Sequence, residues 1–449
     1  MNDWGIIGIG RIGLSMARNM SDKGISLSIY DKAFENKLDP FFEEKKLYPE
    51  LKKVSVFNDI LNFIESIERP RKILILVPSG NPNEHVISKL ITVLSENDII
   101  IDAGNTNPLI SYSNKLKIAK NNILYLGIGV SGGTQGVLEG PSIMIGGDNN
   151  AFKKIKDDLS LITSKTIDNS NSYNFFGDSN QGHFVKMIHN GIEYVEMQLI
   201  ASIYKLLIES NNYTNQNIAQ IFEDWNNNLN SYLIDISTKK MLEKIDDEYL
   251  LEKIDDIADD NGTGRWMLNY GVELGCSLSM LSSALNTRFI SKLKSERNEL
   301  NKNIKRSSLE YKVDINSLKN AYNFCRLINY IQAFCLINAA NKNYNWDISI
   351  SKALNVWSNG SIIKSSLIND LYSNYSVENI LYDKKIINDL NESKSDLINV
   401  ISLSLKNDIS IPCFNDALNY FNSISNNSLS TNMIQAQRNF FGSHTIKFK

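Results

Sequence analysis

One segment of the sequence, Gly182–Tyr194, concentrates side chains that can move protons. Counted from Lys186, the polar residues Asn190, Glu193 and Tyr194 stand at i+4, i+7 and i+8, positions that share one face of a helix. The flanking residues are too apolar for a helix that lies in water, so this face should be buried. A buried lysine and glutamate must be paired or functional, which makes Lys186 and Glu193 candidates for acid–base catalysis.

Histidine is scarce in this chain, with four residues among 449. Two of them, His183 and His189, lie in the same segment, and His189 stands at i+3 from Lys186. This clustering favours a site over a solvated helix surface. His85 belongs to no motif and is expected to be incidental.

A second pattern is suited to binding a dinucleotide. The predicted strand Trp4–Ile7 runs into the motif G-x-G-x-x-G, and a helical pattern follows at once. The first glycine permits a tight turn, the second admits a pyrophosphate, and the third lets the helix approach the strand. Free N–H groups at the start of the helix favour a diphosphate. The residues expected to line this site are Gly8, Gly10, Arg11, Ile12 and Gly13.

The end of the second predicted strand indicates which cofactor is bound. Asp31 stands about 20 positions beyond the glycines, where an acidic residue bonds the adenosine ribose hydroxyls. Its carboxylate would also repel a 2′-phosphate, although the adjacent Lys32 offsets part of that repulsion. The pattern favours NAD, with NADP as the alternative.

The first 150 residues alternate short β-rich apolar runs with helical patterns such as Ile12–Lys23 and Pro82–Ser95. Runs that are apolar almost throughout are typical of parallel strands covered on both faces. The alternation predicts an α/β, Rossmann-like dinucleotide-binding domain over residues 1–179. The predicted strands are Trp4–Ile7, Ile25–Tyr30, Ile73–Val77, Ile99–Asp102, Ile123–Gly127 and Ser142–Ile145.

Beyond about residue 180 the strand signals nearly vanish and glycine becomes rare. This change predicts a large all-α domain over residues 180–427, followed by a short C-terminal tail over 428–449. The longest predicted helices are His183–Ser210, Asn217–Asn227, Met267–Glu299 and Leu318–Asn341.

Composition and charge exclude several classes of protein. The 47 basic and 50 acidic residues give a formal net charge of −3, which argues against a nucleic-acid binder with a broad basic footprint. No apolar stretch reaches the roughly 18 residues of a transmembrane helix, and the first residues do not resemble a signal peptide. The four cysteines lack the spacing of a metal site and suit a reducing compartment, so we expect a cytoplasmic protein without a metal.

Together with further motifs, the segment Gly182–Tyr194 resembles the signature helix of the decarboxylating 6-phosphogluconate dehydrogenases. The resemblance runs from Gly8 to His444 and therefore covers nearly the whole chain. The other matching motifs, in chain order, are Ile101–Asn105, Gly129–Gly133 with Gly140–Ser142, Gly262–Trp266, Ala284–Arg288, and Gln435–Arg438 with His444.

The resemblance implies oxidative decarboxylation of 6-phosphogluconate to ribulose 5-phosphate and carbon dioxide, as in the oxidative pentose phosphate pathway. Lys186 matches the general base that takes the proton from the carbon-3 hydroxyl and then polarises the ketone. Glu193 matches the acid that protonates carbon 1 of the enediol. These roles require the pKa of Lys186 to be lowered and that of Glu193 to be raised.

The resemblance also implies binding residues. Positions for the carboxylate and hydroxyls of the sugar acid are matched by Asn105, Ser131, Gly132, Gly133, His189 and Asn190, and those for its phosphate by Tyr194, Thr263 and Arg288. Val77 and Asn105 match cofactor positions, with Asp31 and Lys32 at the ribose end. Arg438 and His444 match residues that reach the active site of a second subunit, which implies a homodimer.

Three departures from the family pattern bear on the ligands. Asn261 stands where the family has a lysine that binds the substrate phosphate. The segment Asp31–Ala33 replaces the Asn-Arg-Thr that binds the 2′-phosphate of NADP, and Pro78 replaces a frequent lysine in the cofactor loop. The last two changes favour NAD.

Two alternative functions remain open at this point. A β-hydroxyacid dehydrogenase acting on an unphosphorylated sugar acid would share the glycine-rich turn, Asn105 and the catalytic lysine, and Asn261 favours it. A non-catalytic relative would explain the altered cofactor loop, but the intact Lys186, Asn190 and Glu193 argue against it.

Overall fold

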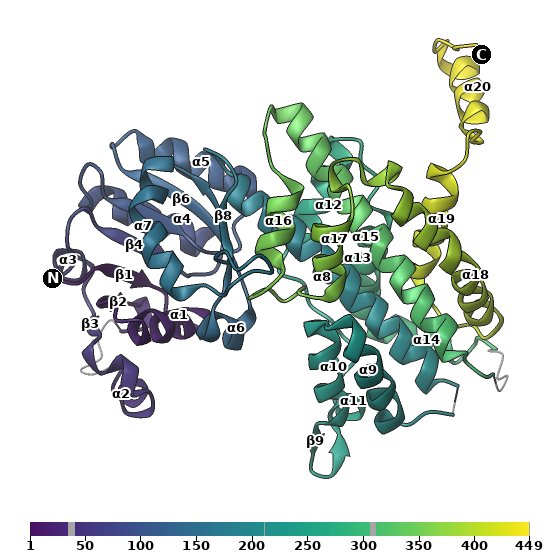
Figure 1. Ribbon diagram of the computed structural model, residues 1–449, viewed down its shortest axis with the longest axis horizontal. Helices are drawn as coiled ribbons and strands as arrows, with labels where there is room; N and C mark the ends of the chain where they lie inside the picture. The colour runs from purple at the N-terminus through teal and green to yellow at the C-terminus, as the bar shows by residue number, and fades with distance from the viewer. Residues whose placement is uncertain (35–40, 211, 306–310, 449) are drawn as a thin grey trace.

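The computed structural model describes residues 1–34, 41–210, 212–305 and 311–448. A sheet flanked by helices forms the N-terminal part, and a body of helices follows it along the long axis of the molecule (Figure 1). The predicted fold class, a Rossmann-like domain followed by a large helical domain, is confirmed.

The N-terminal part is built on an eight-stranded sheet with the order β3-β2-β1-β4-β5-β6-β7-β8. Neighbouring strands are parallel except for β6 and β7. Strands β1, β2 and β5 are buried at every position, as expected when helices cover both faces. The strands are β1 (Trp4–Ile7), β2 (Leu27–Tyr30), β3 (Ser55–Phe57), β4 (Lys72–Ile75), β5 (Ile99–Asp102), β6 (Leu124–Ser131), β7 (Ser142–Gly147) and β8 (Tyr173–Phe175).

All six predicted strands form, whereas the sequence pattern does not predict the edge strands β3 and β8. These two have three residues each, all half-buried, so they lack the apolar run that marks the inner strands. Strand β6 continues past the expected end at Gly127 to Ser131, which brings Ser131 to the carboxyl end of the strand. The helices of this part are α1 (Arg11–Asp22), α2 (Phe42–Leu47), α3 (Ile60–Glu65), α4 (Asn81–Val93), α5 (Pro108–Ala119), α6 (Gly133–Glu139) and α7 (Asn149–Ile162).

The helical body is organised around the long helices α8 and α15. Helix α8 packs on β6 and β7 of the sheet and also on α12, α13 and α15, so it is buried on nearly all sides. A small antiparallel hairpin, β9 (Lys244–Ile245) with β10 (Glu248–Tyr249), interrupts the helices. The helices are α8 (Gln181–Ile208), α9 (Asn215–Leu229), α10 (Tyr232–Leu242), α11 (Leu250–Lys253), α12 (Thr263–Glu273), α13 (Ser279–Ser291), α14 (Lys294–Asn301), α15 (Ile315–Tyr344), α16 (Ile350–Trp357), α17 (Ser366–Asn374), α18 (Lys384–Lys406), α19 (Pro412–Ile424) and α20 (Thr431–Gly442).

The prediction of one helix over Met267–Glu299 is wrong, because α12, α13 and α14 share this segment. Helix α12 ends just before Gly275, whose φ of +68° is the left-handed conformation that stops a helix. The non-helical turn at Leu293 then separates α13 from α14. The first break turns α13 onto α8, and this packing brings Arg288 to the candidate site.

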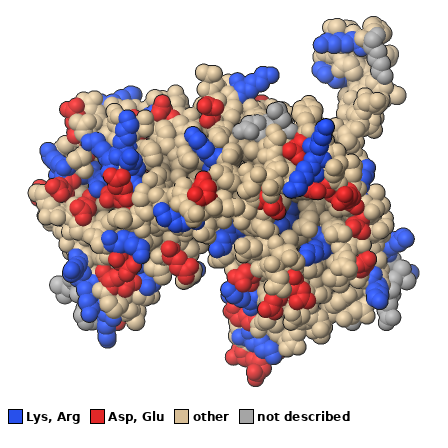
Figure 2. Space-filling model, viewed as in Figure 1, with Lys and Arg blue, Asp and Glu red and all other residues tan. Residues whose placement is uncertain are grey.

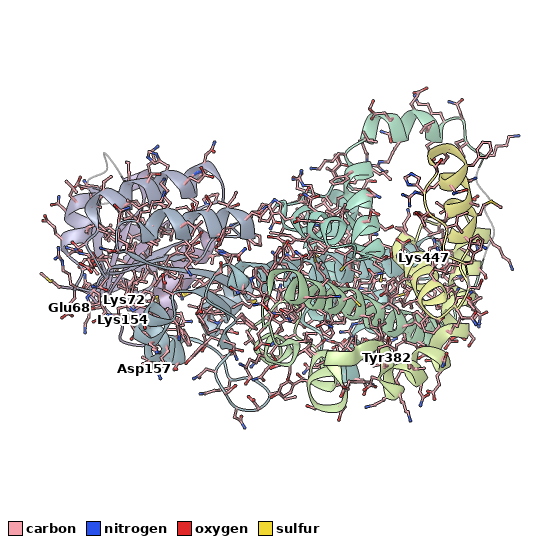
Figure 3. All side chains as sticks on the ribbon, turned by 90° about the horizontal axis from the view of Figure 1, so that it is seen from above. Glu68, Lys72, Lys154, Asp157, Tyr382 and Lys447 are labelled. Carbon is pink, nitrogen blue, oxygen red and sulfur yellow. The ribbon has the colours of Figure 1, made fainter. Side chains whose placement is uncertain are left out.

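The predicted C-terminal tail contains helix α20, which stands away from the body (Figure 1). None of its residues is buried, and the exposed fractions of Phe440 and Phe441 are 91% and 73%. In the view from above, Lys447 marks this end of the molecule, opposite Lys72 in the sheet domain (Figure 3).

Acidic and basic side chains are interspersed over the face of the molecule that Figure 2 shows. Among the described residues, no helix has the length and apolarity needed to cross a membrane. In the same part of the chain, no three His, Cys, Asp or Glu side chains gather closely enough to hold a metal ion.

Candidate active site

A cleft of about 640 Å³ lies between the glycine-rich turn and the polar face of α8. Residues far apart in the sequence meet there, as the turn, the ends of β4, β5 and β6, and helix α8 all contribute to its wall. The predicted site residues that line it are Gly10, Arg11, Ile12, Gly13, Val77, Asn105, Ser131, Gly133, Lys186, Asn190, Glu193 and Tyr194.

The glycine-rich turn has the shape that a dinucleotide requires. Gly8 has a φ of +95°, and a Cβ at Gly13 would lie 2.0 Å from the Gly8 carbonyl oxygen, so both positions need glycine. A Cβ at Gly10 would meet no protein atom within 4 Å and would instead project into the open cleft. The bare backbone of the turn and the N-terminus of α1 therefore fit a pyrophosphate.

Asp31 lies beside this turn, at the end of β2. One carboxylate oxygen accepts a hydrogen bond from Ile9 N at 2.7 Å, and the other accepts one from Ala33 N at 2.8 Å. These bonds fix the carboxylate beside the glycine-rich turn, while Lys32 is exposed next to it.

Asn105 reaches the cleft from the turn that follows β5. The buried Asp102 fixes this turn by accepting hydrogen bonds from Gly104 N at 3.1 Å and Thr106 Oγ1 at 3.0 Å. Asn83 on α4 donates a third bond at 2.8 Å. Asn105 itself stays exposed at the cleft, free to bind substrate or cofactor.

Lys186 is buried because its side chain lies directly on the backbone of β6. A Cβ at Gly129 would come within 2.1 Å of the Lys186 Cβ, so the absence of a side chain at Gly129 makes room for the lysine. Burial lowers the pKa of Lys186 to about 8, although Glu193 opposes the shift. Burial raises the pKa of Glu193, with Lys186 and Arg288 acting in the other direction. Both shifts have the signs that a lysine base and a glutamic acid require.

His189 lies behind Lys186 with no exposed surface. Burial and the neighbouring lysine lower the pKa of His189 well below its usual value, so the imidazole is neutral. Its Nδ1 lies 3.3 Å from Lys186 Nζ and 3.1 Å from Asn190 Oδ1, whereas its Nε2 faces the hydroxyls of Ser131 and Ser361. The other histidine of α8, His183, lies 2.8 Å through its Nδ1 from Ser111 Oγ on α5.

The residues that resemble a phosphate site gather around Asn261. Its Oδ1 accepts hydrogen bonds from Tyr194 OH and from Thr263 Oγ1, each at 2.8 Å. The Arg288 guanidinium lies over the Tyr194 ring, 3.6 Å from its centre. The amide oxygen of Asn261 thus occupies donors that would otherwise be available to a phosphate.

Arg438 and His444 are the predicted site residues that the structure does not bring to this cleft. Arg438 is exposed on α20 and His444 follows that helix, at the end of the molecule that Figure 3 marks with Lys447. Gly132, by contrast, caps α6 at the rim of the cleft, with a φ of +134°.

The sequence patterns miss several residues of the site, among them Ser361 and Ile362. These two come from the loop between α16 and α17, and no charged, histidine or glycine-rich motif marks that loop. The pattern Ser-Asn-Gly, a turn signal, is the one hint that a bend lies there.

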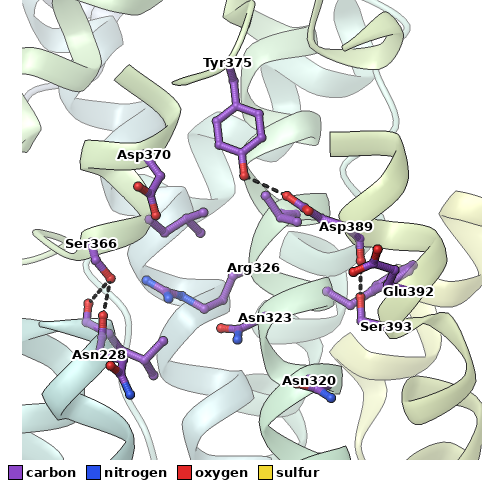
Figure 4. Close-up of a pocket in the computed structure, with 14 residues that line it drawn as sticks. Asn228, Asn320, Asn323, Arg326, Ser366, Asp370, Tyr375, Asp389, Glu392 and Ser393 are labelled. Carbon is purple, nitrogen blue, oxygen red and sulfur yellow. Dashed lines mark hydrogen bonds between the residues drawn. The ribbon is translucent and has the colours of Figure 1, made fainter. Parts of the chain in front are cut away.

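A second hollow, of about 400 Å³, lies in the helical body between α9, α15, α17 and α18 (Figure 4). Arg326 on its wall already donates to Glu196 at 2.9 Å, and Tyr375 donates to Asp389 at 2.7 Å. With acidic lining residues and none of the predicted site residues, it does not suit an anionic sugar acid.

Comparison with known proteins extends over the whole chain. Residues 3–170 match the family described as the NAD binding domain of 6-phosphogluconate dehydrogenase, and residues 182–449 match its C-terminal domain. The chain belongs to the 6-phosphogluconate dehydrogenase family. The family resemblance drawn from the sequence motifs is therefore confirmed.

Individual members of the 6-phosphogluconate dehydrogenase family match this chain along nearly their full length. The decarboxylating enzyme of Staphylococcus epidermidis is 34% identical over 459 residues, covering 99% of this chain and 96% of the relative. That of Staphylococcus aureus strain N315 is 35% identical with the same coverage. The structure of the Plasmodium falciparum enzyme, studied with NADP+ and with 6-phosphogluconate, has a TM-score of 0.92 at 30% identity and covers 100% of this chain and 98% of its own.

Proposed function

We propose that the cleft binds 6-phosphogluconate and a nicotinamide cofactor, and oxidatively decarboxylates the sugar acid to ribulose 5-phosphate. The observation that carries the proposal is the pairing of Lys186 and Glu193 on one buried helix face, opposite the glycine-rich turn. The decarboxylating relatives agree with the function predicted from the sequence. The roles of individual residues are part of the proposal.

Lys186 acts first as a base. In its neutral form, which burial favours, Nζ takes the proton from the carbon-3 hydroxyl of the sugar acid. A nicotinamide cofactor held at the glycine-rich turn would take up the hydride that leaves the same carbon. As an ammonium, Lys186 then polarises the new ketone and gives its oxygen a proton while carbon 1 of the sugar acid leaves as carbon dioxide. Glu193 gives its proton to carbon 1 of the resulting enediol, which was carbon 2 of the sugar acid, and Lys186 takes back the hydroxyl proton as the ketone of ribulose 5-phosphate re-forms.

The other residues bind and orient the substrate. The carboxylate and hydroxyls of the sugar acid are proposed to bind among Asn105, Ser131, Gly132, Gly133, His189 and Asn190. Tyr194, Thr263 and Arg288 form the phosphate end, where the guanidinium supplies the positive charge.

NAD is expected to be the preferred cofactor. The Asp31 carboxylate, pinned beside the turn by Ile9 N and Ala33 N, would repel the 2′-phosphate of NADP. We expect kcat/KM with 6-phosphogluconate to be at least about tenfold higher for NAD, judging by one unfavourable charge contact. Parallel assays with both cofactors measure this ratio, and Asp31→Ser should shrink it, whereas Asp59→Ser at the N-terminal cap of α3 should not. A clear preference for NADP would refute the assignment.

Asn261 is expected to weaken phosphate binding. Restoring the family lysine with Asn261→Lys adds a positive charge and frees the hydroxyls of Tyr194 and Thr263. The KM for 6-phosphogluconate should fall about tenfold, since one charged hydrogen bond contributes ~1.5–3 kcal/mol. The KM for unphosphorylated gluconate should not fall. An equal change for both acids would show that Asn261 does not face the phosphate.

We also propose a homodimer in which Arg438 and His444 complete the partner's site. The support is the exposed apolar surface of α20, including Phe440 and Phe441, which a second copy of the chain would bury. Mixing inactive Lys186→Ala subunits with inactive Arg438→Ala subunits should restore up to about a quarter of the activity, as random pairing predicts for a closed dimer. Absence of recovery would count against shared sites.

We propose a cytoplasmic location because the cysteines form no disulfide bonds. All four, Cys276, Cys325, Cys335 and Cys413, are free thiols, as is usual in a reducing compartment.

A further inference from the structure

The loop between α16 and α17, residues 358–365, crosses from the helical body onto the sheet domain. Gly360 lies so close to Gly140 that an added Cβ would come within 2.5 Å of the Gly140 oxygen. The Gly360 carbonyl accepts a hydrogen bond from Ser142 N at 3.1 Å, and Ser172 Oγ donates to the Asn359 carbonyl at 2.8 Å. The loop therefore docks one domain on the other through its backbone.

The same loop contacts a histidine of the candidate site. His189 Nε2 lies 3.0 Å from Ser361 Oγ and 2.9 Å from Ser131 Oγ. The exposed fractions of Ser361 and Ser131 are 3% and 2%, so water does not compete for these bonds. The ring nitrogen is held between one hydroxyl from the helical body and one from the end of β6.

Backbone N–H groups of the loop orient both hydroxyls. Ile362 N donates to Ser131 Oγ at 3.2 Å, and Ile363 N donates to Ser361 Oγ at 3.1 Å. A hydroxyl oxygen has two lone pairs and one proton, so each serine keeps one acceptor site and one donor for His189. Either serine hydroxyl can accept a hydrogen bond from a protonated Nε2 or donate one to the lone pair of an unprotonated Nε2.

The opposite ring nitrogen faces the base. His189 Nδ1 lies 3.3 Å from Lys186 Nζ and 3.1 Å from Asn190 Oδ1. An ammonium on Lys186 donates to Nδ1, which leaves the ring proton on Nε2. A neutral Lys186 allows the ring proton to lie on Nδ1, toward Asn190, and Nε2 then becomes an acceptor. Because the two serine hydroxyls can donate as well as accept a hydrogen bond, they can bind Nε2 in either protonation state of Lys186.

We propose that Ser361 is a positioning residue for Lys186: acting through His189, it holds the imidazole against Nζ in both protonation states of the lysine. Because Ser361 arrives on the docking loop, the geometry of the base then depends on the contact between the two domains. The inference deepens the proposed function and rests on it. Other charged or titratable side chains near Lys186 in the described chain are Glu193 and Tyr194 on α8, Arg288 on α13 and Arg11 on α1.

Ser361→Ala in the full-length enzyme tests this inference, with Ser358→Ala as the matched control. Ser358 lies in the same loop and accepts a hydrogen bond across the domain contact from Ile167 N at 3.1 Å. Its own hydroxyl donates to the Asn355 carbonyl at 2.7 Å rather than to His189. The ring nitrogens of ¹⁵N-labelled histidine are observed by NMR, where four residues give a simple spectrum. The His189 signals should change in Ser361→Ala and stay unchanged in Ser358→Ala.

Kinetics supplies the second readout. Ser361→Ala should lower kcat about tenfold, as expected for one buried hydrogen bond, with little change in KM for 6-phosphogluconate. It should also move the rising limb of the kcat/KM profile to lower pH, because the Lys186 ammonium loses a well-held acceptor. Ser361→Thr, which keeps the hydroxyl, should retain the wild-type profile.

Equal losses of kcat in Ser361→Ala and Ser358→Ala, with unchanged His189 signals, would overturn the inference and leave the loop a docking role alone. The NMR readout needs no turnover. Altered His189 signals in a protein whose wild-type form does not oxidise the sugar acid would therefore support the hydrogen bond and overturn the proposed function.

Discussion

Replacing Lys186 with alanine is expected to lower kcat with 6-phosphogluconate about 10³-fold, because the reaction loses its general base. The lysine is enclosed by β6 and His189, and its pKa of about 8 leaves an appreciable neutral fraction at mildly alkaline pH. Formation of reduced cofactor, followed by its absorbance, measures the loss.

Lys205→Ala is the matched control for this change, because Lys205 lies on the same helix but is exposed and paired with Glu209. It should leave kcat unchanged. If Lys186→Ala oxidised the sugar acid at a normal rate and lost only decarboxylation, the role assigned to Lys186 would be wrong.

The same assignment fixes the pH dependence of the wild-type enzyme. Protonated Lys186 cannot accept the hydroxyl proton, so kcat/KM should rise with pH and level off above the lysine pKa of about 8. In Lys186→Ala this limb should be absent from the residual activity.

Glu193→Gln is expected to lower kcat about 10²-fold, since glutamine keeps the shape of the side chain but cannot donate the proton to carbon 1 of the enediol, the former carbon 2 of the sugar acid. Burial raises the pKa of Glu193, the direction that favours the protonated form a general acid needs. In heavy water the wild type should place one deuterium on carbon 1 of the product with a single stereochemistry, and Glu193→Gln should lose that selectivity. NMR of the ribulose 5-phosphate measures it.

Glu209→Gln, at the exposed end of the same helix, serves as the control and should keep both rate and stereochemistry. Retention of a single stereochemistry in Glu193→Gln would show that another group protonates carbon 1.

Much of the site follows from local sequence patterns. The spacing of Lys186, Asn190 and Glu193 places them on one helix face, and the structure confirms that all three line the cleft. The glycine-rich turn is equally local, because the positive φ of Gly8 and the close contact of Gly13 with the Gly8 carbonyl both arise within the turn.

Other parts depend on contacts between distant segments, which periodicity does not reveal. His189 and Ser361 are 172 positions apart and meet because the α16–α17 loop docks on the sheet domain. The breaks that divide Met267–Glu299 into three helices occur at Gly275 and Leu293. The glycine is a stop signal visible in the sequence, whereas the leucine carries none. The hydrogen bonds that the Tyr194 and Thr263 hydroxyls donate to Asn261 also depend on the folded structure and are not evident from the sequence.

The most direct test of the central claim uses 6-phosphogluconate labelled with ¹⁴C at carbon 1. Incubation of the wild-type enzyme with NAD should release one labelled carbon dioxide for each reduced cofactor formed, because Lys186 serves both oxidation and decarboxylation. Reduced cofactor without released carbon dioxide, or neither product with NAD and NADP alike, would contradict the account.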